Sequence, residues 1–221
     1  MKSHQFSRYV RQLKGWRETV FVLALAQRAL PNYQLFSEAV QLEGADRVAL
    51  CLSDFWAAMS ERIAENRLIA WLDDVQLRTP LAEDYDYYGV HPACDFCYLI
   101  EQALLSQINP EKPRGGDAGE RSLQTVMDFL EMSEGEGLSE YKLIKLFDRS
   151  PLMQRELEFQ KELVYRLRKQ PFPSAEFLLQ MCEFAADDGV SNIGICLTED
   201  EDESEVEDIS ISDSCKEGEA E

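Results

Sequence analysis

Histidine is scarce in this chain, which has 221 residues and only two histidines, His4 and His91. A serine nucleophile needs an adjacent base, and only His91 lies where it could act as one. The sequence contains no Gly-x-Ser-x-Gly turn and no glycine-rich phosphate loop. Serine-based catalysis and phosphate-loop nucleotide binding therefore have little support.

Long hydrophobic runs are also missing, since no apolar stretch approaches the roughly 20 residues that cross a bilayer. The strongest apolar segment, residues 20–26, ends in Ala-x-Ala and imitates a secretory signal peptide. The charged residues Arg17 and Glu18 directly flank this short run, and its apolar residues follow helical spacing. We therefore expect residues 20–26 to form a buried helix of a cytoplasmic protein that does not enter a membrane.

Positive charge is under-represented, because 22 Lys and Arg stand against 42 Asp and Glu, a formal net charge of −20. Residues 199–221, with twelve acidic residues and one lysine, carry −11, which leaves −9 for residues 1–198. This field repels phosphate-rich partners, so we expect neither nucleic acid nor an anionic membrane as partner unless a local basic patch exists. The densest basic run, residues 166–169, is interpreted as a solvated helix end.

Apolar residues recur three and four positions apart along nearly the whole chain, and this spacing predicts an all-α fold. We expect a single domain over residues 1–198, a bundle of about eight to ten helices, which residues 109–116 could divide into two lobes. Residues 190–196 are predicted to be extended and to pack on the body. The acidic tail, residues 199–221, is predicted to be disordered because it has too little apolar surface to bury.

Five local signals predict where helices begin and where the backbone turns. Gly15 should separate the first two helices, and Pro31 should begin a third at its first position. Ser150 and Ser174 should cap the helices that follow them. Gly89 should supply a positive φ in the turn before its helix.

The densest group of reactive side chains lies at residues 81–105, where acidic and aromatic residues precede a helix with Cys-x-x-C in its first turns. A helix N-terminus favours anions and thiolates, which would suit a redox pair made of Cys94 and Cys97. No βαβ pattern surrounds the pair, however, and Cys97 lies on the apolar stripe of its helix. The six cysteines, scattered through a chain of this length, indicate a reducing compartment.

A metal site is a second hypothesis for this segment. The residues that could hold a metal ion are His91, Cys94, Asp95 and Cys97. No second ligand pair is visible in the sequence to complete a tetrahedral site, so we expect no cofactor. Structural roles are the alternative: Asp84 and Asp86 can accept backbone hydrogen bonds, Asp95 can face a partner across the bundle, and the three tyrosines at 85, 87 and 88 can cover the helix end.

Two motifs carry a resemblance to a known family. Residues 86–95, Asp-Tyr-Tyr-Gly-Val-His-Pro-Ala-Cys-Asp, and residues 191–195, Ser-Asn-Ile-Gly-Ile, are similar to the bacterial YjaG family, also termed domain of unknown function 416. Gly15-Trp16 and Pro31-Asn32-Tyr33 agree with the family's N-terminal region, so the resemblance covers residues 5–196. It implies an all-helical fold and no assigned biochemical role. Genome neighbourhood in the family suggests a link to histidine-kinase signalling, which is an association and not a mechanism.

The resemblance also bears on the Cys-x-x-C motif. In the family, the position of Cys94 is usually aliphatic and that of His91 is often tyrosine, whereas Asp95 and Cys97 match. A thiol activity at Cys94 and Cys97 would therefore not be a family activity.

These observations predict a non-catalytic interaction or regulatory module whose partner is a protein, with a signalling component as one candidate. A monomer and a homodimer both remain open. The candidate functional surface consists of Asp84, Asp86, Tyr88, Gly89, His91, Pro92, Asp95, Asn192 and Gly194. The alternative is a metal- or thiol-dependent enzyme centred on residues 84–97.

Overall fold

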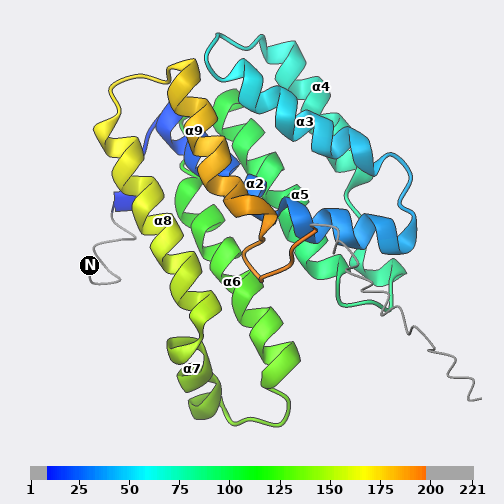
Figure 1. The fold of residues 1–221 in the computed structure, drawn as a ribbon. Helices are drawn as coiled ribbons and strands as arrows, with labels where there is room; N and C mark the ends of the chain where they lie inside the picture. Colours follow the sequence, from blue (N-terminus) through cyan, green and yellow to red (C-terminus); the bar gives the residue numbers. More distant parts are fainter. Residues whose placement is uncertain (1–8, 198–221) are drawn as a thin grey trace, which may run out of the picture.

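The structure, a computed structural model, describes residues 9–197, and most of these residues lie in helices. The described part has no β-strand, so the predicted all-α bundle is confirmed (Figure 1). No helix in it is long and apolar enough to span a bilayer. The tail at 199–221, predicted to be disordered, lies outside the described residues. The α-helices are α2 (Trp16–Val40), α3 (Ala45–Ala58), α4 (Glu65–Arg78), α5 (Val90–Ile108), α6 (Gly115–Glu134), α7 (Glu140–Arg149), α8 (Pro151–Lys169) and α9 (Ala175–Ala186), with 3₁₀ turns η1 (Ala82–Asp84) and η2 (Asp187–Gly189).

Helix α2 is the centre of the bundle, because α3, α5, α6, α8 and α9 all pack against it. It begins after Gly15, as predicted, and every residue from Glu18 to Ala26 is buried. The prediction that Pro31 begins a new helix is wrong, since Pro31 lies inside α2, which continues to Val40. An internal proline costs a helix about 3 kcal/mol, and the packing of α2 against its neighbours offsets that cost.

Two layers of helices flank α2 and α5. Figure 1 shows α3 and α4 on one side and α8 and α9 on the other, while α3 also contacts α9. Gly44, with φ of 74°, makes the tight turn from α2 into α3. The main apolar core lies between these layers, and its fully buried aromatic residues include Phe21, Phe55 and Phe96.

Helices α6, α7 and α8 extend beyond the other helices as an arm, with α7 at its tip (Figure 1). A second, smaller apolar cluster fills the arm, and it includes Val126, Leu130, Met153 and Ile193. None of the residues of α7 is buried. Helix α6 begins at Gly115, inside the segment 109–116 that was predicted to be a linker.

The two predicted serine caps have different outcomes. Ser174 Oγ accepts a hydrogen bond from the backbone N–H of Phe177 at the start of α9, as predicted. Ser150 occupies the predicted position before Pro151, but its hydroxyl makes no capping bond. The reason is that α7 ends where α8 begins. The Ser150 N–H donates back to the carbonyls of Leu146 and Phe147 in α7, and the Ser150 Oγ is buried with no partner in the part of the chain that the structure describes.

The last described residues fold back onto the bundle. Val190 and Cys196 form an isolated antiparallel bridge, so the predicted extended segment is confirmed. The Ser191 N–H donates to the Ile195 carbonyl at 2.8 Å, which closes a tight turn within the segment.

Candidate functional site

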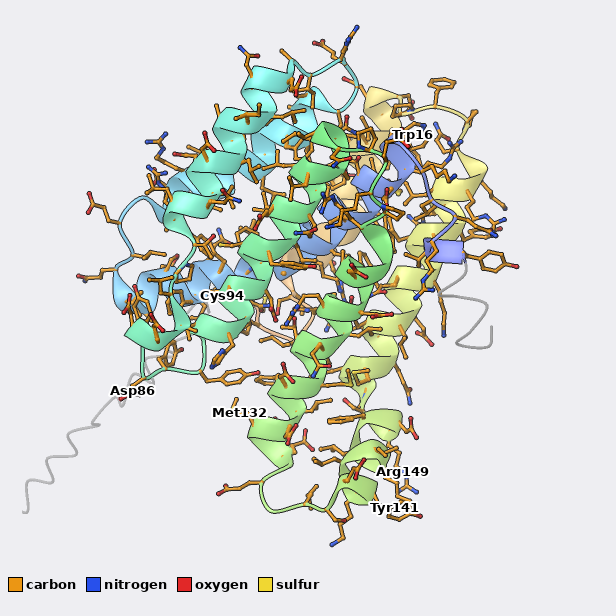
Figure 2. The ribbon with its side chains drawn as sticks, turned by 180° about the vertical axis from the view of Figure 1, so that it is seen from behind. Trp16, Asp86, Cys94, Met132, Tyr141 and Arg149 are labelled. Atoms are coloured by element: carbon orange, nitrogen blue, oxygen red, sulfur yellow. The ribbon has the colours of Figure 1, made fainter. Side chains whose placement is uncertain are left out.

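The turn before α5 places its polar residues on the surface and does not gather them. Asp84, Asp86 and His91 are all exposed, and Figure 2 shows Asp86 at the outer edge of the molecule, away from Cys94. Among the described residues, no three His, Cys, Asp or Glu side chains come together closely enough to bind a metal ion. The predicted metal ligands are therefore not brought together.

Gly89 does not have the positive φ predicted for it, and its φ of −54° is that of a right-handed helix. The glycine is instead accommodating an aromatic ring, because a Cβ on it would lie 2.6 Å from Cε1 of Tyr87. Tyr87 and Tyr85 both reach back to Phe36 of α2, with ring centroids at 6.3 and 5.1 Å. Two of the tyrosines thus cover the end of α2, and Pro92 behind them is buried.

Asp95 faces α6, as predicted for a residue that bridges the bundle. Its Oδ2 accepts a hydrogen bond of 2.7 Å from Thr125, and Arg121 lies 3.5 Å from its Oδ1. Burial raises the pKa of the Asp95 carboxyl, and the Thr125 bond and the Arg121 charge offset this effect only in part. Tyr88 lies on the same side, next to Phe129 of α6. Asp95 and Tyr88 therefore hold α5 to α6.

The two cysteines of the Cys-x-x-C motif have the opposite of the environment that a reactive thiol needs. Cys97 is 1% exposed, and burial raises its pKa to about 12. Burial, together with the Asp95 charge, also raises the pKa of Cys94, whose thiol donates to the Pro80 carbonyl at 3.2 Å. A redox thiol has a lowered pKa, so this geometry does not support the thiol branch of the enzyme alternative.

Asn192 and Gly194 are the members of the predicted surface that are distant in sequence, and both have structural roles. Asn192 is buried between two helices: its Oδ1 accepts from Asn32 of α2 at 2.9 Å, and its Nδ2 donates to the Ser122 carbonyl of α6 at 3.3 Å. Gly194 is exposed and has a φ of 85°, which favours glycine. The segment 191–195 therefore fastens α2 to α6 and contributes little surface.

A buried ionic network lies next to Asn192, and the sequence analysis missed it. Arg28 of α2 donates through Nε to Glu156 Oε2 of α8 at 2.8 Å, and through Nη1 to Asp187 Oδ2 at 2.8 Å. Arg155 donates to the same oxygen of Asp187 at 2.9 Å. Burial opposes ionisation of Asp187, but the two guanidinium groups outweigh it and hold its pKa below the usual range.

The other carboxylate oxygen of Glu156, Oε1, also accepts hydrogen bonds. It accepts from Ser122 at 2.7 Å and from Gln160 at 2.9 Å, and Gln160 also donates to the Gly119 carbonyl. One sequence signal could have revealed this network. The polar residues Glu156 and Gln160 lie at helical spacing on the same stripe of α8 as the buried Met153, and polar residues on a buried stripe need partners.

Glu18 forms a second buried polar contact that sequence reasoning did not find. Its Oε1 accepts from the backbone N–H groups of Arg114 and Gly115, at 2.7 and 2.8 Å. These donors are at the N-terminus of α6, where the helix dipole favours a carboxylate. The buried charged groups of Glu18, Arg28 and Glu156 thus all form contacts between helices.

Comparisons with known proteins agree with this architecture. The sequence model of a family described as "Protein of unknown function (DUF416)" matches residues 5–196. "Uncharacterized protein YjaG" of Escherichia coli is 24% identical over 185 residues, which cover 83% of this chain and 92% of the relative. An "Uncharacterized protein" of Haemophilus influenzae is 30% identical, with the same coverage of both chains. The crystal structure of a DUF416 family protein from Shewanella baltica superposes with a TM-score of 0.77 at 26% identity, covering 87% of this chain and 98% of that one.

Proposed function

Because the chain belongs to the DUF416 family of proteins of unknown function, we propose a role from its own surface, namely that of a non-catalytic protein-interaction module. The buried carboxylates Glu18 and Glu156 support this role, since both are engaged by groups of the fold itself. A catalytic carboxylate needs a free side facing substrate. We therefore expect the functional residues to lie on the exposed surface.

One observation carries the proposal. Leu77, Leu81 and Tyr87 are 78%, 60% and 46% exposed, and they lie within eleven residues of one another in the chain. Single exposed apolar side chains are normal, whereas several in one place are typical of a binding surface. We name this region, residues 77–91, the acidic–apolar surface.

Its polar members are carboxylates. Glu83, Asp84 and Asp86 are all exposed between the apolar side chains, and within residues 9–197 none of them forms an ion pair. The complementary partner is a protein surface with an apolar pocket rimmed by Lys and Arg. A component of bacterial histidine-kinase signalling is the partner class that we propose to test first.

The competing enzyme hypothesis has a separate test. A metal-dependent site centred on residues 84–97 would bind one metal ion per chain, and elemental analysis of purified protein measures this directly. A stoichiometric metal that is lost when His91 and Asp95 are replaced would favour the enzyme over the interaction module.

The interaction is tested by affinity capture with matched baits. The surface bait carries Asp84→Lys, Asp86→Lys and Tyr87→Ser, all at exposed positions. The control bait carries Glu140→Lys, Asp148→Lys and Tyr141→Ser on α7, which are also exposed positions and give the same change in net charge. A partner kept by wild type and control but reduced at least about tenfold by the surface bait supports the proposal, since a hot-spot loss of 1.4 kcal/mol has that size. A partner retained by all three baits would contradict the assignment of this surface.

A further inference from the structure

In contrast to the acidic–apolar surface, the end of α8 carries a cluster of positively charged side chains. A groove of about 340 Å³ runs along the end of α8, and its lining residues are Tyr9, Lys161, Val164, Tyr165, Arg168 and Lys169. Three of these six side chains are cations and none is an acid. We name it the basic groove. It provides the local basic patch that the net charge of the chain alone does not reveal.

Two segments that are distant in sequence build the patch. Of the described residues, 9–17 contain three Lys or Arg and no acid, and residues 161–169 contain four Lys or Arg and one acid, Glu162. Arg17 joins them, because its guanidinium donates to the carbonyls of Leu167 and Gln170 at 3.0 and 2.7 Å. Figure 1 shows the first described residues (blue) beside α8. Glu162 is already paired with Arg166 at 2.7 Å, so it does not neutralise the groove.

Aromatic rings hold the cations of the groove in place. The Arg168 guanidinium lies 4.3 Å from the centre of the Tyr9 ring, and Lys169 Nζ lies 4.0 Å from that of Tyr165. A ring satisfies one face of a cation and leaves the others available for anions. The dipole at the end of α8 accounts for cations in its last turn only, and Lys161 lies two turns earlier. The groove therefore has more positive charge than the helix end requires.

The chain itself carries an occupant of matching chemistry. The tail at 199–221 has a net charge of −11 and contains Val206, Ile209 and Ile211 among its acids. The described chain stops at Leu197, and the 24 residues that follow can extend roughly 80 Å at about 3.4 Å each. Residues 1–198 carry −9 in total, so most of the body repels the tail while the basic groove attracts it.

We propose that the acidic tail of this chain binds in the basic groove of the same molecule. Covalent attachment supplies an effective concentration in the millimolar range, so the tail covers the groove ahead of other anionic partners. The tail thereby acts as an internal competitor for any acidic protein segment or phosphate-rich surface. This interaction is independent of the acidic–apolar surface and of the proposed function.

Zero-length carbodiimide cross-linking of the full chain tests the proposal, because it joins a lysine amine to a carboxylate in direct contact. Mass spectrometry of the monomer fraction should find links from residues 199–221 to Lys161 and Lys169. Lys142 and Lys145 on α7, which are also exposed, provide the internal control and should link at least about fivefold less, because they lie outside the attracting groove. The groove links should also fall severalfold between about 50 mM and about 500 mM salt, as screening shortens the Debye length.

A pair of charge reversals separates the groove from general electrostatics. Arg168→Glu should remove most of the links to Lys161 and Lys169, whereas Arg149→Glu on α7 should leave them unchanged. Both positions are exposed, and equal melting temperatures would show that both variants fold. Tail links spread evenly over all surface lysines, or an absence of tail links at low salt, would overturn the proposal. Links found only in a dimer fraction would also overturn it, because the tail would then bind a second copy.

Discussion

Arg28 and Glu156 form an ion pair of 2.8 Å in the centre of the bundle, and their side chains are only 2% and 0% exposed. The pair joins α2 to α8 across 128 residues of sequence. Burying two charges is costly, so such a pair contributes to stability mainly when every remaining donor and acceptor is satisfied. Asp187, Ser122 and the Gln160 side-chain N–H group meet most of that condition here, whereas Gln160 Oε1 is buried with no hydrogen-bond partner among the described residues.

Removing one partner of this pair should be strongly destabilising. Glu156→Ala leaves Arg28 buried with Asp187 as its remaining charged partner, and we expect a loss of about 3–5 kcal/mol in the free energy of unfolding. Glu158→Ala, two residues away on the exposed face of α8, should change it by less than about 0.5 kcal/mol. Urea unfolding followed by circular dichroism measures both. Equal effects of the two variants would show that the ion pair does not hold the helices together.

The pKa of Asp187 predicts an acid-sensitive contribution to stability. Because Arg28 and Arg155 lower the folded-state pKa, the ionised carboxylate stabilises the fold above its unfolded-state pKa of about 4. That contribution is lost as the pH falls through the lower folded-state value. Asp187→Asn should therefore destabilise the protein most at neutral pH, and the difference from wild type should shrink below about pH 4. A difference that is constant with pH would contradict this.

Asp95 should show the opposite dependence. Its folded-state pKa is raised, so the folded state favours the protonated carboxyl, and the resulting stabilisation is present below the unfolded-state pKa and lost as the pH rises through the folded-state value. Asp95→Asn, which keeps an acceptor for Thr125, should gain stability relative to wild type as the pH increases from about 4. Unfolding free energies across this range, measured beside Asp187→Asn, should show slopes of opposite sign.

The cysteines should react in the order of their burial and not in the order of the Cys-x-x-C motif. Burial raises the pKa of Cys51 and of Cys97 to about 12 each, so both should resist iodoacetamide in the folded protein at mildly alkaline pH. Cys196 is exposed and should be modified first of the three. Peptide mass spectrometry after timed alkylation measures each site. Rapid modification of Cys94 below neutral pH would revive the thiol-enzyme hypothesis.

Two glycines of α6 should respond oppositely to alanine. A Cβ at Gly119 would lie 3.1 Å from Gln160 Oε1 and 3.5 Å from Phe21, both in the core, so Gly119→Ala should cost about 1–3 kcal/mol through overpacking. A Cβ at Gly116 would meet Arg11 at an ordinary 3.7 Å. Gly116→Ala should therefore be neutral or stabilising by up to about 1 kcal/mol, the helix-propensity gain. Thermal unfolding of both variants makes the comparison.

Structural features that depend on residues close together in the sequence were predicted correctly. Helical spacing identified the all-α fold, and Ser174 was recognised as the cap of α9 because a cap and its N–H group are three residues apart. The stop at Gly15 was also correct. Each of these features is decided within one or two helical turns, where sequence spacing and spatial distance are nearly the same quantity.

The failures arise where tertiary packing overrides a local preference. Pro31 should end a helix by its own chemistry, but it is buried in a helix that five others surround. Gly89 has an ordinary helical φ, so the backbone does not require glycine at this position. Glycine is required here because the ring of Tyr87 occupies the space that a Cβ would take. Ser150 cannot be both the end of α7 and a side-chain cap of α8. None of these constraints is visible in the neighbouring residues.

The candidate site was least predictable. Asp95 was correctly expected to face another helix, yet its partner Thr125 could not be named from the sequence. The pairs formed by Arg28 with Glu156 and with Asp187 join residues 128 and 159 positions apart. The spacing of Glu156 and Gln160 on a buried stripe indicates that they need partners, but a single sequence does not identify partners at that separation, and only the fold shows which residues pair.

The placement of Asn192 has a consequence for how the protein is made. Asn32 in α2 is synthesised early, but its partner Asn192 is 160 residues further along the chain. Until Asp187 and Asn192 have been synthesised, Arg28 and Asn32 of the central helix lack these two partners. We expect the incomplete chain to expose apolar surface to chaperones and proteases during this time. A chain that ends before Asp187 lacks both of these contacts, and one that ends between Asp187 and Asn192 still lacks the contact to Asn32, so we expect folding to be completed only after Asn192 has been synthesised.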